Sequence, residues 1–141
     1  MPTLVGPIPF ILRRGAHDPA TFAYTVDQVE GLIGADEGGL VLQFRESTHT
    51  YASAQPRPPR ESELRELRIP LDALRRVDLR RGWFRTRLVL AAADLRAFEP
   101  FKPWLNQGEL VLAIPRAERG AAADLASSIE LALANRLLGS G

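Results

Sequence analysis

The arginines of residues 76–90 form the pattern in this chain that is best suited to binding a ligand. Within this segment, arginine and aliphatic residues alternate on either side of a turn at Gly82. Because successive side chains of a strand point to opposite faces, we predict two paired strands with an apolar face (Val77, Leu79, Leu88 and Leu90) and a basic face (Arg76, Arg80, Arg85 and Arg87). Guanidinium groups bind phosphates and carboxylates bidentately. These four arginines are therefore the candidate anion-binding residues.

The same basic face has a second interpretation, a solvated surface whose charges are screened by salt. Lys102 is the only lysine among eighteen basic residues, so the use of arginine is also typical of biased codon usage. Asp78 is the only acidic residue within the segment, and like charges that face each other across strands lower stability. From the sequence, an anion site and a solvated surface both remain open.

Residues with a recognisable catalytic or metal-binding pattern are absent. The two histidines, His17 and His49, are not in a metal-ligand spacing such as HExxH. The chain also lacks the GxSxG, P-loop and GxGxxG motifs. Asp36 and Glu37 lie in a glycine-rich turn, where acidic residues favour the backbone geometry. We expect no catalytic, cofactor-binding or metal-binding residues, and a small enzyme with an unrecognised site is only a third hypothesis.

Aromatic residues gather at two places after Gly82. Trp83 lies at the predicted hairpin turn, and Phe98, Phe101 and Trp104 follow in a stretch interrupted by prolines. Clustered exposed aromatic residues mark protein interfaces or membrane-surface contacts, but aromatic residues next to prolines also fold back over a core. The candidate interface residues are therefore Trp83, Phe98, Phe101 and Trp104, with a lid over the core as the alternative.

Strand-like alternation and turn signals extend over most of the chain. Residues 21–45 predict a hairpin around a turn at residues 34–39, residues 64–69 predict a strand that Pro70 ends, and residues 110–114 predict a last strand. Between these, residues 46–62 are polar and proline-rich, which predicts a mobile loop. The period then changes, because apolar residues of the segment 121–138 recur at spacings of three and four. That segment predicts one amphipathic helix.

Composition limits the possible functions further. A chain of 141 residues with 45% hydrophobic and 25% charged residues fits one domain with a core. The absence of cysteine excludes disulfides and thiolate metal sites, and a net charge of +1 argues against general affinity for nucleic acid. Glycine and prolines interrupt the early apolar stretch, a poor pattern for a signal peptide, and no apolar run approaches the roughly 18 residues of a membrane span. We expect a cytoplasmic protein.

A resemblance to a known family rests on the order of these elements and on residues 69–79. The sequence Ile-Pro-Leu-Asp-Ala-Leu is followed by Arg-Arg-Val-Asp-Leu, a tight turn, a further strand and finally the helix. This pattern resembles pleckstrin-homology-like domains, in particular the small bacterial PH-like and GRAM-like domains. The resemblance implies an α+β fold: a mostly β antiparallel barrel or sandwich of about six or seven strands, capped by one C-terminal helix. It covers residues 21–138 and leaves residues 1–20 as an N-terminal extension.

The resemblance suggests phosphoinositide binding, but the sequence departs from the family at the headgroup site. Such domains use lysine and arginine around the loop between the first two strands, whereas residues 35–39 contain neither. No headgroup-binding residue is carried over. We expect a non-catalytic binding or scaffolding domain for protein partners, including self-association, through an open strand edge or the aromatic loop. The alternative is a module that uses the arginine-rich hairpin to bind an acidic ligand, such as lipid headgroups at a membrane surface.

Overall fold

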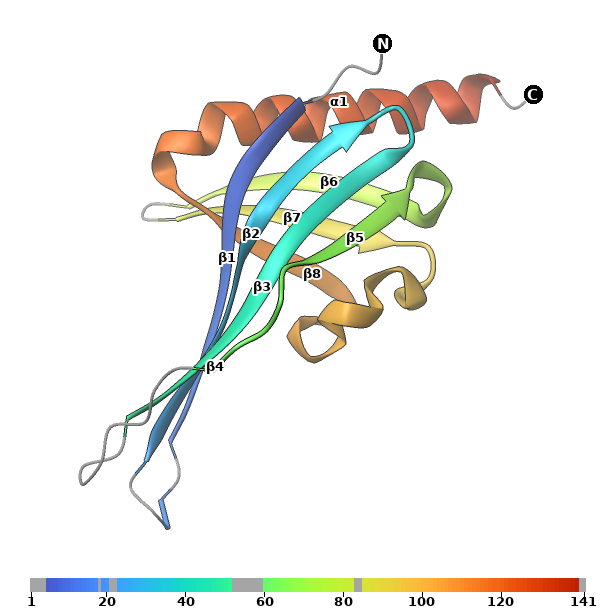
Figure 1. Ribbon diagram of the computed structural model, residues 1–141. Helices are drawn as coiled ribbons and strands as arrows, with labels where there is room; N and C mark the ends of the chain where they lie inside the picture. Colours follow the sequence, from blue (N-terminus) through green and yellow to red (C-terminus); the bar gives the residue numbers. More distant parts are fainter. Residues whose placement is uncertain (1–4, 18, 21–22, 52–59, 83–84, 140–141) are drawn as a thin grey trace.

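The structure, a computed structural model, describes residues 5–17, 19–20, 23–51, 60–82 and 85–139. In these residues, eight antiparallel strands form one sheet, and a single α-helix follows them (Figure 1). The strands are β1 (Val5–His17), β2 (Tyr24–Asp36), β3 (Gly39–Tyr51), β4 (Arg60–Glu61), β5 (Arg65–Pro70), β6 (Leu74–Arg81), β7 (Thr86–Ala92) and β8 (Glu109–Ile114). The helical segments are the 3₁₀ turns η1 (Leu71–Ala73), η2 (Leu95–Trp104) and η3 (Arg116–Glu118), and the helix α1 (Arg119–Gly139).

Strands β1, β2 and β3 form the first half of the sheet as a continuous meander. At the turn between β2 and β3, the Asp36 carboxylate accepts hydrogen bonds from the backbone N–H groups of Gly38 (2.8 Å) and Gly39 (3.2 Å). Gly39 has a φ of 140°, and a Cβ there would lie 2.2 Å from the carbonyl oxygen of Ile69. The turn therefore requires glycine at this position.

The burial pattern confirms the predicted alternation on β3 and confirms it in part on the β6–β7 hairpin. Leu40, Leu42 and Phe44 of β3 are buried, whereas the residues between them are less buried. Val77, Leu88 and Leu90 are buried as predicted, but Leu79 is only partly buried and Val89, on the face of the arginines, is fully buried. Strand β5 pairs with β3, and β8 extends the β6–β7 hairpin into a second meander.

The two meanders meet at β1 and β8. Sheet order is β4-β3-β2-β1-β8-β7-β6, with β5 also paired to β3. In the register of β1 and β8, the only residue pair is Ile11 with Ala113, so the two strands diverge on either side of this contact. Figure 1 shows the sheet folded over, with β1, β2, β3 and β5 in front of β6, β7 and β8. Beyond the fold, β1, β2 and β3 run on together as a projecting arm.

Aromatic residues fill the core between the meanders. The ring centroid of Phe101 in η2 lies 4.4 Å from that of Phe44 and 6.5 Å from that of Phe10. Phe98, also in η2, is fully buried. The stretch predicted as an aromatic loop is therefore a 3₁₀ segment that closes one side of the core.

Helix α1 confirms the predicted C-terminal amphipathic helix and packs on both β1 and β6. Its buried residues follow the predicted spacing and include Ala122, Leu125 and Ile129. The Glu130 carboxylate accepts a hydrogen bond of 2.9 Å from the backbone N–H of Val77, so the helix satisfies a backbone donor of β6, the terminal strand of the sheet. Among the described residues, no helix combines the length and the apolar character needed to cross a bilayer.

The sheet differs from the expected six- or seven-stranded barrel or sandwich in three respects. It has eight strands and is not closed into a barrel. Residues 5–17, expected to belong to an N-terminal extension, form β1, because Ile8, Phe10 and Leu12 alternate toward the core despite the neighbouring prolines. Within the segment 46–62, predicted as a mobile loop, residues 46–51 continue β3 and residues 60–61 form β4, whereas residues 52–59 lie outside the described residues.

We predict that Leu125→Ala lowers the free energy of unfolding by about 2–5 kcal/mol, because it removes a fully buried side chain at the contact of α1 with the sheet. Urea denaturation followed by circular dichroism measures the change. The matched control is Leu131→Ala on the same helix, where the side chain is 63% exposed and the expected change is within about 0.5 kcal/mol. Equal effects of the two substitutions would show that α1 does not pack in this way.

Candidate arginine groove

The four arginines predicted on the β6–β7 hairpin fall into two groups. Arg76 and Arg80 have carboxylate partners: the guanidinium of Arg76 lies 2.8 Å from Glu109, and that of Arg80 lies 3.7 Å from Asp78 and 3.9 Å from Glu109. The sequence pattern identified Asp78 but not Glu109, which reaches this face because β8 pairs with β7. These two arginines are therefore partly neutralised.

The other two predicted arginines, Arg85 and Arg87, line a groove of about 530 Å³ at the junction of β1 and β8. Two further arginines that the pattern did not identify, Arg13 of β1 and Arg116 of η3, line the same groove. Its floor includes the apolar residues Ile11, Val111, Ala113, Ile114 and Pro115. We call this site the arginine groove.

Strand register explains why these arginines converge. Ala113 of β8 lies between Arg87 of β7 on one side and Ile11 of β1 on the other. Arg13 is two residues beyond Ile11 and therefore points to the same face of the sheet. Strand β8 ends next to Pro115, and η3 begins with Arg116 at the rim of the groove. All four guanidinium-bearing residues are exposed.

The arginine groove contains no carboxylate among its lining residues. Arg13 donates hydrogen bonds of 3.2 and 3.1 Å to the neutral side-chain oxygen of Gln28, which fixes the position of its guanidinium without cancelling the charge. The Gln28 amide in turn donates to the carboxylate of Glu30. In the part of the chain that the structure describes, no ion pair involves any of the four groove arginines.

An unbalanced set of guanidinium groups over an apolar floor can hold an anion. Each guanidinium offers a planar fork of donors that matches a phosphate or carboxylate, and charge-assisted hydrogen bonds are about twice as strong as neutral ones. A solvated surface would lose much of this attraction to salt screening. Because several arginines line one groove, one anion can contact more than one of them at short range, where screening weakens the attraction least.

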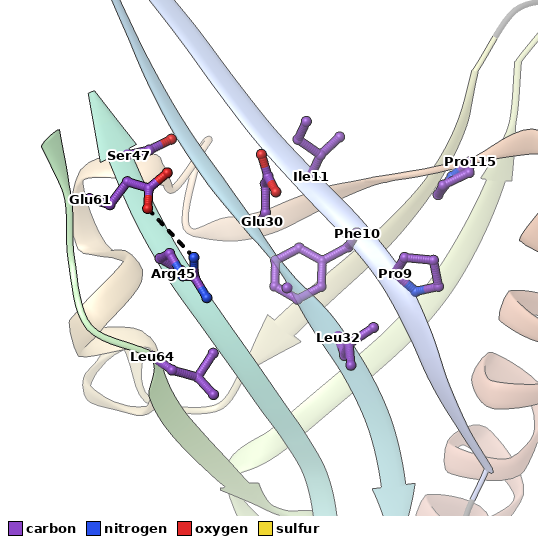
Figure 2. Close-up of a pocket in the computed structure, with 11 residues that line it drawn as sticks. Pro9, Phe10, Ile11, Glu30, Leu32, Arg45, Ser47, Glu61, Leu64 and Pro115 are labelled. Atoms are coloured by element: carbon purple, nitrogen blue, oxygen red, sulfur yellow. Dashed lines mark ion pairs between the residues drawn. The ribbon is translucent and has the colours of Figure 1, made fainter. Parts of the chain in front are cut away.

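A second groove, of about 520 Å³, lies on the same outer face over β1, β2 and β3 (Figure 2). It shares Ile11 and Pro115 with the arginine groove. Figure 2 shows Arg45 of β3 and Glu61 of β4 next to each other on one side of it, with a guanidinium-to-carboxylate distance of 3.6 Å. Glu30 adds a further negative charge. This groove therefore carries mixed and largely balanced charge, unlike the arginine groove.

The candidate interface residues are not gathered on one exposed surface. Phe98 and Phe101 are fully buried, so the expectation that they contribute an exposed interface is wrong, and the alternative of a lid over the core describes them. Trp104 is only partly buried, and the guanidinium carbon of Arg14 lies 4.9 Å from the centroid of its ring. Trp83 lies outside the described residues.

Other titratable groups do not form a comparable site. His49 lies within β3, opposite Val26. Among the described residues, no three side chains from histidine, aspartate and glutamate gather closely enough to hold a metal ion. Comparison with protein-family models, with curated proteins and with solved structures finds no match. The arginine groove is therefore interpreted from its own geometry.

We predict that Arg87→Gln stabilises the protein at low ionic strength, because Arg87 lies directly opposite Arg80 across the β6–β7 ladder and like charges in this position repel by about 0.2–1 kcal/mol. Urea denaturation at about 0.01 M and about 1 M salt measures the effect, which should vanish as the screening length falls from about 30 to about 3 Å.

The matched control is Arg76→Gln, which removes a positive charge from the same face but breaks the 2.8 Å contact with Glu109. This variant should be no more stable than the original protein at low salt. A stabilising effect of Arg76→Gln equal to that of Arg87→Gln would mean that net charge, and not the local pairing, determines the result.

Proposed function

We propose that this protein is a non-catalytic binding module that holds an anionic group, a phosphate or a carboxylate, in the arginine groove. The supporting observation is that every charged residue that lines the groove is an arginine. On the same sheet face, Arg76 and Arg80 of β6 are instead paired with Asp78 and Glu109. An anionic ligand would supply the missing negative charge.

The charges that line the arginine groove favour an anionic ligand, whereas those that line the second groove do not. Positive charges that converge without partners repel one another, and this cost is offset when an anion binds. In the second groove, Arg45 is the one cationic residue of the lining and is already paired with Glu61, so this groove presents no unpaired positive charge to an anion. A catalytic role has no comparable support, because the arginine groove offers no general base or nucleophile.

The proposal includes the PH-like architecture suggested by residues 69–79. Its support is the order of elements, in which antiparallel strands are followed by one helix that packs against them. The open sheet and the additional strands β1 and β4 are differences that the family resemblance did not imply. A cytoplasmic location, expected from the poor signal-peptide pattern and the lack of an apolar run long enough for a membrane span, is part of the same proposal.

The test is binding of inorganic tripolyphosphate at low ionic strength, measured by isothermal titration calorimetry. Because a hydrogen bond to a charged group is worth about 1.5–3 kcal/mol, the double variant Arg87→Gln/Arg116→Gln should bind at least about tenfold more weakly than the original protein. Its thermal unfolding should be unimpaired, because both side chains are exposed.

The matched control is Arg75→Gln/Arg119→Gln, which removes the same charge from two exposed arginines outside the groove. When the titration is repeated at about 0.15 M salt, it should change the affinity less than about twofold, since surface charges more than about 8 Å from the ligand are then largely screened. Equal weakening in both double variants, or no binding by the original protein, would refute the proposed function.

A further inference from the structure

Strand β1 has an unpaired edge beside the arginine groove. It pairs with β2 as far as His17, but its register with β8 contains only Ile11 and Ala113. From Arg13 to His17, no described strand pairs with β1 on the side away from β2. Figure 1 shows the reason, because β8 turns toward η2 while β1 continues into the arm. We call this part of β1 the β1 edge.

The backbone groups of the β1 edge are available to another strand. Outside the strand ladders, none of the backbone hydrogen bonds among the described residues involves residues 13–17. Alternate residues of an edge strand direct their N–H and C=O groups outward, which makes such an edge a template for an added strand. An extended peptide bound in this way gains affinity from the main-chain hydrogen bonds and specificity from the side chains on its two faces.

The two faces next to the β1 edge have different chemistry. On one face lies Arg13 with the rest of the arginine groove. On the other face lies Arg14, whose guanidinium donates a 2.9 Å hydrogen bond to the carbonyl oxygen of Pro103 and stacks near Trp104. A strand placed here would present alternate side chains to arginines and to a partly exposed aromatic ring.

We propose that the ligand of the arginine groove is an extended acidic segment of a protein partner, which pairs with the β1 edge as an additional strand. The inference rests on the proposed anion-binding function and specifies its ligand. Acidic side chains two residues apart, about 6.6–6.8 Å along the strand, face the arginines. Apolar side chains between them face Trp104.

An acidic strand would use both features of the site, the groove arginines and the unpaired backbone of β1, whereas a free anion would use only the arginines. A phosphate or a lipid headgroup would use the guanidinium groups but would leave the backbone of residues 13–17 unpaired. An uncharged strand would use the backbone but would not balance Arg85, Arg87 and Arg116. The acidic strand pairs with both, and the absence of carboxylates from the lining of the groove provides the charge complementarity.

The test uses a short fluorescent peptide in which glutamate alternates with valine, with fluorescence anisotropy to follow its binding to the full chain. Two N-methylated forms of the peptide are compared. One carries methyl groups on the odd-numbered amides and the other carries them on the even-numbered amides. Because only one phase of amides faces the β1 edge, one form should lose at least about tenfold in affinity and the other should bind like the parent peptide.

Hydrogen exchange supplies the second measurement. The peptide should slow the exchange of alternate backbone amides within residues 13–17, and inorganic tripolyphosphate should not. Arg87→Gln/Arg116→Gln should weaken peptide binding, whereas Arg75→Gln/Arg119→Gln should leave it unchanged. Equal affinity of both N-methylated forms would show that the peptide does not pair as a strand and would overturn the inference.

The remaining outcomes separate the inference from the proposed function. If tripolyphosphate or vesicles of acidic lipid bind in the groove and the peptide does not, the function stands and the peptide ligand is wrong. If neither the peptide nor tripolyphosphate binds, both proposals fail. If the amides of residues 13–17 exchange slowly without peptide and the protein sediments as a dimer, the β1 edge is occupied by a second copy and the inference is overturned.

Discussion

The short contact between β1 and β8 is the constraint on which the rest of the structure depends. Each meander is held internally by long ladders, but the two are joined in the sheet only where Ile11 meets Ala113. Because the strands diverge from this point, side chains from three separated parts of the chain converge on one face, and a stretch of β1 backbone is left without a strand partner. A longer β1–β8 ladder would close the sheet further and pair the β1 edge.

So short a junction cannot by itself hold the meanders together, and the packing around it does so. Phe101 fills the space between Phe10 and Phe44 on one side of the core. On the other side, α1 packs on β1 and β6, and Glu130 supplies the acceptor for the backbone of Val77. Two helical segments, η2 and α1, therefore cover the core on either side of the junction. The surface at the junction is free to be charged, since it contributes little to the core.

The sequence predicted local features well and long-range features poorly. Alternation identified the inward residues of β3 and most of those of β6 and β7, and the three- and four-residue spacing identified α1, because these patterns depend on neighbouring residues alone. The proline-interrupted residues 5–12 hid β1. Arg13 and Arg116 were missed because only the β1–β8 register brings them to Arg85 and Arg87. The burial of Phe98 was likewise undecided, since its burial depends on partners far away in the chain.

The order of the two meanders and the helix along the chain has a consequence for synthesis. Within residues 5–51 and within residues 74–114, the strand contacts join strands that follow one another in the chain, so each meander can form soon after it leaves the ribosome. The part of their apolar inner faces that α1 covers stays open to water until residues 119–129 have emerged and packed on β1 and β6. During that interval the incomplete chain exposes apolar sheet surface, which is the kind of surface that chaperones bind. The time that translation needs to reach residue 129 therefore adds to the time for which this surface is exposed.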